Sequence, residues 1–100
     1  MPGTKMSKNN TILELVKARI GISSRVRDEY LEKIIEGVQS ELEDQQGVSI
    51  DLDSPHVLMF LVDFATWRYQ NRDTNDGMPR HLQFRLHNLI VSSVNKNDDG

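Results

Sequence analysis

Residues 54–71 read S-P-H-V-L-M-F-L-V-D-F-A-T-W-R-Y-Q-N, and this stretch decides the fold class. Ser54 is a good helix N-cap and Pro55 is favoured at the first helical position, so the pair marks the start of a helix. Over 57–69 apolar side chains occur nearly all round the helix, which is typical of a helix buried at the centre of a domain. We therefore expect a central helix over 55–71 that other segments must cover.

The clearest amphipathic pattern precedes that stretch, over 24–46. Its apolar side chains fall within one half of a helical circumference, and acidic side chains fill most of the other half. The apolar set is Val26, Tyr30, Leu31, Ile34, Ile35, Val38 and Leu42. Ser23 or Ser24 stands where an N-cap belongs, and Gly47 follows the end of the pattern. The pattern predicts a helix with one face on the core and an acidic face in water.

A shorter helix is expected over 11–20. Thr11 and Glu14 have the spacing of a capping box, which marks a helix start. Apolar residues follow at helical intervals, namely Ile12, Leu13, Val16 and Ile20. Gly21 stands where such a helix would stop.

A last helix, which begins with proline, is expected over 79–94. Its core stripe consists of Leu82, Leu86, Leu89 and Ile90. The four segments together predict an all-α fold, a small bundle of about four helices that forms a single domain over 11–94. The polar ends are expected to be a flexible segment over 1–10 and a disordered tail over 95–100.

Composition narrows the classes of function. The chain has 100 residues, no cysteine and a formal net charge of −3. Without cysteine it has no disulfides and no thiolate metal sites. A net negative charge disfavours binding to duplex DNA, which usually requires a basic surface to neutralise phosphates. The longest apolar run, over 57–62, is far shorter than a membrane span, so no membrane partner is expected.

No pattern in the sequence points to catalysis, a cofactor or a metal. The histidines at 56, 81 and 87 lack the spacing of metal ligands on a helix. No phosphate-binding glycine motif and no nucleophile-elbow motif is present. The acidic residues over 24–46 lie on an expected wet face, where no desolvated pocket can tune a catalytic pKa. We expect a non-enzymatic protein, and an enzyme with weakly patterned residues stays an alternative.

The expected helices over 55–71 and 79–94 carry apolar side chains on more than one side. A domain this small can rarely cover both sides of two helices, and aromatic and methionine side chains are enriched at protein interfaces. The candidate subunit-interface residues are Met59, Phe60, Trp67, Phe84 and Val91, together with Arg72. Irregular packing within one chain would bury the apolar members equally well, so both interpretations stay open.

A helix-turn-helix DNA-binding protein is an alternative class of function. The turn at Gly21 does join two expected helices over a short distance. A recognition helix must show basic or amide side chains outward, however. Beyond Arg25 and Arg27 the helix after this turn is acidic outward and would repel phosphate along most of its length. A small helical DNA-binding or antitoxin-like regulator is therefore the second hypothesis.

Four stretches of the chain stand in a recognisable order. They are Ile12–Lys17, the acidic segment Asp28–Leu42, the buried Val57–Ala65 followed by W-R-Y-Q-N-R at 67–72, and Met78-Pro79 with Leu82–Ile90. This order resembles the small head–tail connector (adaptor, or DNA-packaging) proteins of tailed bacteriophages and prophages. The resemblance covers residues 11–93, and its most specific element is W-R-Y-Q-N-R followed by M-P.

The resemblance implies a structural subunit of a ring of about twelve or thirteen copies. Such a ring docks on the portal protein, extends the DNA channel and receives a downstream tail-joining or stopper protein. DNA passes through it without sequence-specific binding, and an acidic lining suits that passage because it does not grip phosphates. The implied location is the head–tail junction of the virion, and the bacterial host cytoplasm during assembly. The role involves no catalysis and no cofactor.

Within W-R-Y-Q-N-R we expect mainly structural roles. Trp67 and Tyr69 should anchor the core near the end of the buried helix. Asn71 and Arg72 stand at its C-terminal end, where an amide satisfies free carbonyls and a cation complements the helix dipole. Arg72 has a second interpretation, as one half of an ion pair between subunits.

Overall fold

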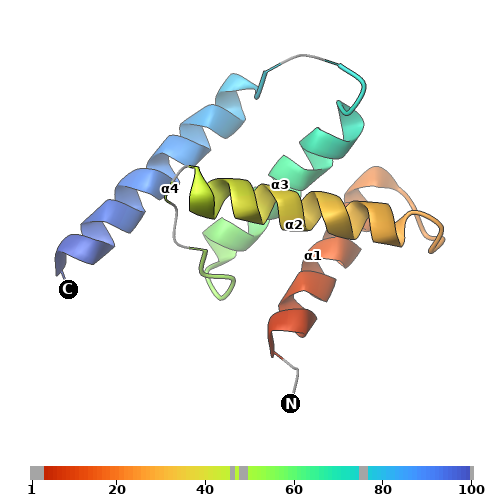
Figure 1. The fold of residues 1–100 in the computed structure, drawn as a ribbon, viewed down its shortest axis with the longest axis horizontal. Coiled ribbons are helices and arrows are strands. Elements are labelled where there is room, and N and C mark those ends of the chain that lie inside the picture. The colour runs from red at the N-terminus through yellow and green to blue at the C-terminus, as the bar shows by residue number, and fades with distance from the viewer. Residues whose placement is uncertain (1–3, 46, 48–49, 75–76, 100) are drawn as a thin grey trace.

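The computed structural model contains four helices, α1 (Thr4–Ile20), α2 (Asp28–Asp44), α3 (Pro55–Gln70) and α4 (Arg80–Asp99) (Figure 1). The structure describes residues 4–45, 47, 50–74 and 77–99, and for 4–9 and 93–99 it describes the backbone alone. No strand occurs in this described part of the chain. The predicted all-α fold of four helices is therefore confirmed.

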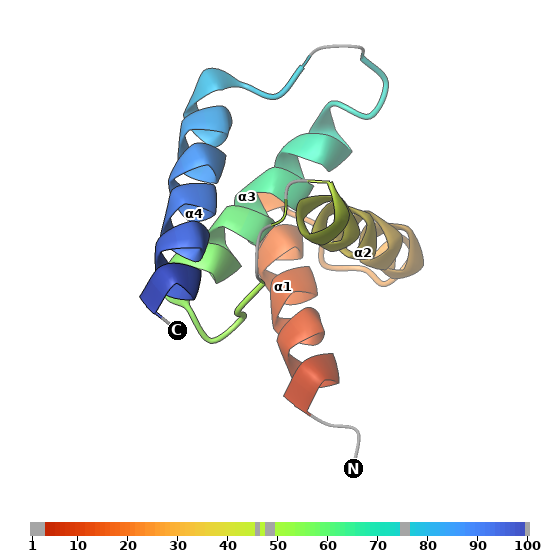
Figure 2. The same cartoon turned by 60° about the vertical axis from the view of Figure 1, so that its left-hand side comes forward.

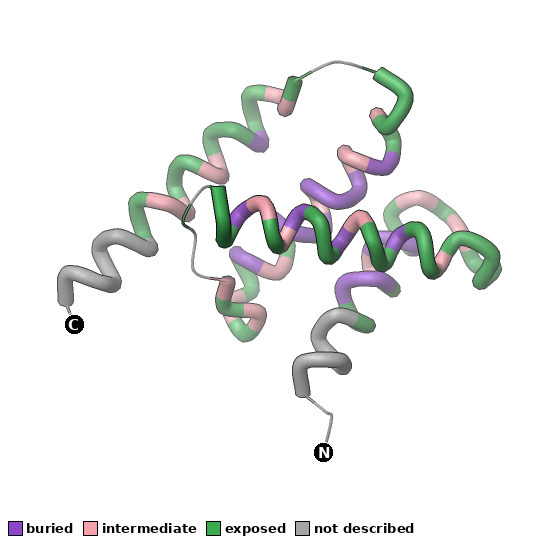
Figure 3. Tube along the Cα trace, in the orientation of Figure 1, coloured by how far each residue is buried: buried purple, intermediate pink, exposed green. Residues whose placement is uncertain are grey.

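Helix α3 lies at the centre of the fold. Half of its 16 residues are buried, namely Val57, Phe60, Leu61, Val62, Phe64, Ala65, Thr66 and Tyr69. Each of the other helices packs against α3, whereas α4 contacts no second helix within the described residues. In Figures 1 and 2, α2 crosses one side of α3 while α1 and α4 flank it. Figure 3 shows that the buried segments gather where these helices meet.

The predicted start of α3 is confirmed. Ser54 is the N-cap, with extended backbone angles of φ −82° and ψ 121°, and Pro55 follows at the first helical turn. The Leu58 N–H donates to the Ser54 carbonyl at 2.9 Å and forms the first helical hydrogen bond. Proline suits this position because its fixed φ is helical and its missing N–H would have no partner there.

The other helices bury one side each against α3. The core residues that they contribute are Ile12, Leu13 and Val16 from α1, Leu31, Ile35, Val38 and Leu42 from α2, and Leu82 from α4. In α1 and α2 these positions recur at helical spacing, and in α4 the partly buried Leu86, Leu89 and Ile90 continue the stripe that Leu82 begins, as the sequence predicts. Burial of these side chains is the main favourable contribution to folding.

The start of α2 differs from the prediction. The helix begins at Asp28, its N-cap is Arg27, and neither Ser23 nor Ser24 caps it. Asp28 instead lies against α1, where its Oδ1 is 2.8 Å from the Nζ of Lys17. That oxygen has no partner at hydrogen-bonding angles, so the contact is ionic, and the positive end of α2 supports the same charge. Helix α2 therefore begins without a side-chain cap, and its first residue is held to α1 by a tertiary ion pair.

The two outer ends of the fold also differ from the prediction. Helix α1 begins at Thr4, within the segment expected to be flexible, and Thr11 lies inside the helix instead of capping it. Helix α4 continues to Asp99, beyond the expected end at 94. Neither added stretch contains glycine or proline, which are the strongest helix breakers. Residues 1–3 and 100 lie outside the described part.

Gly21 ends α1 as predicted. Its φ of +87° lies in the left-handed region that favours glycine. The backbone N–H groups of Gly21 and Ile22 both donate to the Lys17 carbonyl, at 2.8 and 3.0 Å. This left-handed cap satisfies the last turn of α1 and redirects the chain toward α2.

Candidate subunit interface

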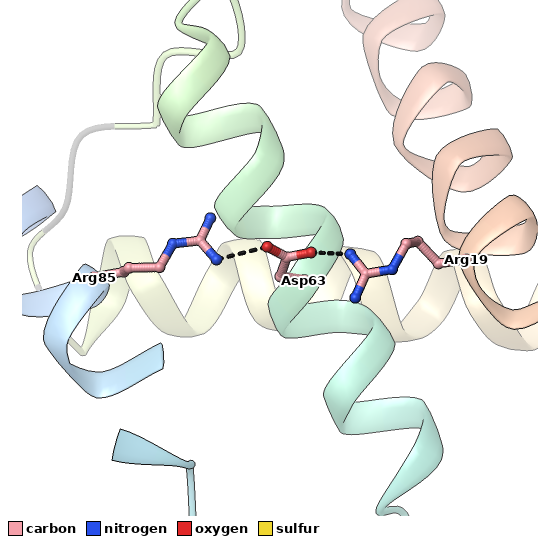
Figure 4. A network of polar contacts seen from close by, with 3 residues as sticks. All are labelled: Arg19, Asp63 and Arg85. Carbon is pink, nitrogen blue, oxygen red and sulfur yellow. Dashed lines mark hydrogen bonds and ion pairs between the residues drawn. The ribbon is translucent and has the colours of Figure 1, made fainter. Parts of the chain in front are cut away.

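Asp63 interrupts the apolar surface of α3 and is bound from two sides. Arg19 of α1 and Arg85 of α4 both bond its carboxylate, on Oδ1 and Oδ2 respectively (Figure 4). The Nη1 atom of Arg85 is 2.6 Å from Oδ2. In this view α2 runs behind α3, so the three side chains lie on the side of α3 opposite α2. Because α1 and α4 do not contact each other, this ion bridge joins them across α3.

The two guanidinium groups determine the charge of Asp63. Partial burial by itself raises the pKa of this carboxyl. The hydrogen bonds and positive charges of Arg85 and Arg19 together outweigh that effect and hold the pKa below its ordinary value. Asp63 is therefore ionised at neutral pH, and the two cations compensate the charge of a partly buried carboxylate.

The end of α3 is closed by residues of the W-R-Y-Q-N-R motif. Asn71 is the C-cap, and its side-chain Nδ2 and backbone N–H each donate to the Trp67 carbonyl at 3.0 Å. Arg72 donates from Nη1 to the Tyr69 carbonyl at 2.6 Å, and its guanidinium lies 4.2 Å from the centroid of the Tyr69 ring. These contacts agree with the capping role predicted for Asn71 and with the structural interpretation of Arg72.

Tyr69 links this motif to the start of α2. Its ring is buried and packs edge-on against Tyr30, with 6.0 Å between the ring centroids. The Tyr69 hydroxyl accepts a hydrogen bond from Arg27, whose guanidinium also lies 5.8 Å from the ring centroid. The predicted role of Tyr69 as a core anchor is confirmed. Arg27, one of the two basic residues near the Gly21 turn, is thereby engaged within the protein.

Two of the predicted interface residues pack inside the subunit. Phe60 is only 1% exposed, and the Arg85 guanidinium lies 5.5 Å from its ring centroid. Phe60 is therefore buried within the subunit, where Arg85 of α4 lies over its ring. Trp67 is partly buried and stacks on Phe64, with 6.4 Å between the ring centroids. Trp67 thus serves the core, as the motif suggested.

The remaining predicted residues lie at the surface. Met59 is 42% exposed, Phe84 68% and Val91 44%. Arg72 is exposed as well. Phe84 and Val91 are seven residues apart and so lie on the same side of α4, away from Leu82, which is 1% exposed. Part of the expected surplus of apolar surface is therefore found on the outward side of α4.

Sequence reasoning missed the Asp63 bridge and the exposure of Val26. An aspartate within an apolar run does signal that a cation must lie nearby, but it does not indicate which one. Val26 precedes the actual start of α2 and is 88% exposed, although the periodicity placed it on the buried half.

The described residues include no group of three His, Cys, Asp or Glu side chains arranged to hold a metal ion. Within the same residues, no helix is both long enough and apolar enough to cross a bilayer. No family model, no curated protein and no solved structure matches the chain.

Replacing Asp63 tests the ion bridge. We expect Asp63→Asn to lower the free energy of unfolding at pH 7 by about 1–3 kcal/mol, since both arginines lose a charged partner. The folded-state pKa is lowered, so this contribution is present above the unfolded pKa of about 4 and is lost as the pH falls through the folded value. Urea unfolding of the natural protein and of Asp63→Asn should show that the difference in their free energies of unfolding becomes smaller as the pH falls.

Glu43→Gln, which removes an exposed carboxylate from α2, is the matched control. It should change the free energy of unfolding by less than about 0.5 kcal/mol. Equal effects of the two substitutions, or a difference for Asp63→Asn that does not depend on pH, would contradict the bridge.

Replacing Asn71 separates capping from partner binding. Asn71→Ala removes one side-chain hydrogen bond to the Trp67 carbonyl, so thermal or urea unfolding should show a loss of about 1 kcal/mol. Gln70→Ala changes the exposed residue just before it and should stay within about 0.5 kcal/mol. Unchanged stability combined with lost self-association would show that Asn71 contacts a partner instead.

Proposed function

We propose that this protein is a structural subunit of a head–tail connector ring of a tailed bacteriophage or prophage. The observation that carries the proposal is the order of its features along the chain. An acidic amphipathic helix is followed by a buried helix that ends in W-R-Y-Q-N-R, and Met78-Pro79 then precedes the last helix. In this role the ring docks on the portal protein, extends the DNA channel and receives a tail-joining or stopper protein.

Exposed apolar side chains on α4 support self-association. Phe84 and Val91 face water together on a helix whose opposite side is anchored by Leu82. A ring of identical subunits needs two different surfaces on each copy, because each subunit contacts both of its neighbours. A large exposed aromatic side chain is typical of such a surface, since burying it on assembly contributes much of the binding energy.

The distribution of charge supports passage of DNA without capture. Helix α2 contains seven acidic residues and one lysine, a net charge of −6, so the other residues together carry +3 of the chain's −3. Asp28 pairs with Lys17 and Glu41 pairs with Arg68. The other five acidic side chains are exposed to solvent, namely Glu29, Glu32, Glu36, Glu43 and Asp44. A surface of this sign does not hold phosphates, and a channel for moving DNA benefits from that property.

The same charges weaken the alternative of a DNA-binding or antitoxin-like regulator. In a helix-turn-helix reading, α2 would enter the major groove and present its acidic side to the phosphates. A DNA-binding protein would use a cation such as Arg27, near the start of this helix, to contact DNA. Here Arg27 donates a hydrogen bond to the Tyr69 hydroxyl. We therefore favour the structural role, which requires no catalytic residue and no cofactor.

Electron microscopy with the cognate portal tests the proposal. The purified protein is mixed with the portal of the same phage and, as a control, with the portal of an unrelated phage. We expect a coaxial ring of density on the cognate portal only. Absence of portal binding, combined with a specific gel shift of an operator fragment, would replace the connector role with the regulator.

A further inference from the structure

Helix α4 is attached to the rest of the fold through α3 alone. Within the described residues it packs against α3 and against no other helix, whereas α1 and α2 pack on each other as well as on α3. The linker of residues 71–79 joins α4 to the end of α3. In Figures 1 and 2, α4 accordingly lies at the outer edge of the fold. It can therefore leave α3 while the other three helices stay packed together.

The contact between α4 and α3 has an apolar part and a charged part. The apolar part is a stripe of one buried and three partly buried side chains of α4, namely Leu82, Leu86, Leu89 and Ile90. The charged part is Arg85, which bonds Asp63 at 2.6 Å and lies over the Phe60 ring. The stripe supplies apolar burial, and the directional ion pair fixes how α4 lies along α3. We refer to the surface of α3 around Phe60 and Asp63 as the α4 seat.

The linker is long enough to carry α4 to an adjacent copy. Asn71 and Arg72 are bonded to the last turn of α3, which leaves residues 73–79 for the connection. An extended chain spans about 3.3–3.6 Å per residue, so these residues reach roughly 24 Å. Helix α3 has 16 residues and is therefore about 24 Å long as well. A linker with this reach can place α4 on the α3 of a neighbour while both helices stay intact.

We propose that each copy in the ring gives its α4 to the α4 seat of the next copy. The contacts are those that the structure shows within one subunit, so the exchange needs no new complementary surface. Asp63 then receives Arg19 from its own copy and Arg85 from its neighbour, and the ion bridge joins two subunits. Because every copy gives one helix and receives one, the contact is heterologous and can close into a ring. The inference rests on the proposed ring role, which supplies the neighbouring copy.

Assembly on the portal determines which form prevails. The closed subunit and the exchanged ring contain the same contacts between α3 and α4, so their free energies differ mainly by the entropy of association. In dilute solution this entropy favours the closed subunit. Copies gathered on one portal have a high effective concentration, which favours exchange. The exposed acidic side chains of α2 take no part in the exchange and stay free to line the DNA channel.

Chemical cross-linking distinguishes closed from exchanged copies, because the natural chain has no cysteine. A variant with both Asp63→Cys and Arg85→Cys is treated with a bis-maleimide reagent that spans the length of the lost arginine side chain. In the isolated subunit we expect the two thiols to be joined within one chain, so a denaturing gel shows monomers. After assembly on the cognate portal we expect the reagent to join different chains into a covalent ladder. Each single variant, assembled in the same way, should give monomers only.

The rate of assembly tests the exchange with a milder change. Helix α4 must detach before it is exchanged, so Arg85→Gln, which removes the ion pair with Asp63, should speed ring formation at least about fivefold. The final amount of ring should stay the same, because the pair is lost equally from the closed and the exchanged forms. Arg80→Gln removes an exposed arginine from the same helix and should leave the rate unchanged.

The possible outcomes distinguish the exchange from the ring role. If no ring forms on the cognate portal, both fail. If rings form but the double cysteine variant gives only internally linked monomers, α4 stays on its own α3, so the exchange is wrong and the ring role stands. Rings that form no faster with Arg85→Gln than with the natural protein also overturn the exchange. This rate decides alone if the double variant does not fold.

Discussion

Burial of α3 is the constraint on which the rest of the structure depends. Its apolar side chains point in nearly all directions, so no single helix can cover it, and α1, α2 and α4 each pack against a different part. Asp63 adds a condition to this packing, because a partly buried carboxylate needs compensating charge. Arg19 and Arg85 supply that charge from two helices that do not otherwise contact each other. One acidic residue thereby helps to position both flanking helices.

Local patterns predicted most of the fold, whereas contacts between distant residues did not follow from them. The 3.6-residue period of α2 and the Ser54-Pro55 start of α3 depend only on neighbours in the chain. The first residue of α2, Asp28, is instead paired with Lys17 of α1, a contact that no pattern within α2 indicates. In the Asp63 bridge, Arg19 is 44 positions from Asp63 along the chain and Arg85 is 22 positions from it. No sequence spacing indicates which cations will contact Asp63 once the three helices have packed.

Local patterns likewise predicted only part of the candidate interface. Because apolar side chains occur on more than one side of the last helix, the sequence predicted that some of them would stay exposed. Phe84 and Val91 are exposed in the structure. Phe60 had the same signal but lies under α4, whose path the sequence did not reveal.

Native-state hydrogen exchange on the isolated subunit tests the central claim most directly, namely that α3 is the core and α4 is held by α3 alone. We predict that the amides of residues 60–69 exchange only through global unfolding. The amides of residues 83–90 should exchange through a local opening of clearly lower free energy, because α4 can detach while the other three helices stay packed. Equal exchange free energies for α3 and α4, or faster exchange in α3, would contradict this account.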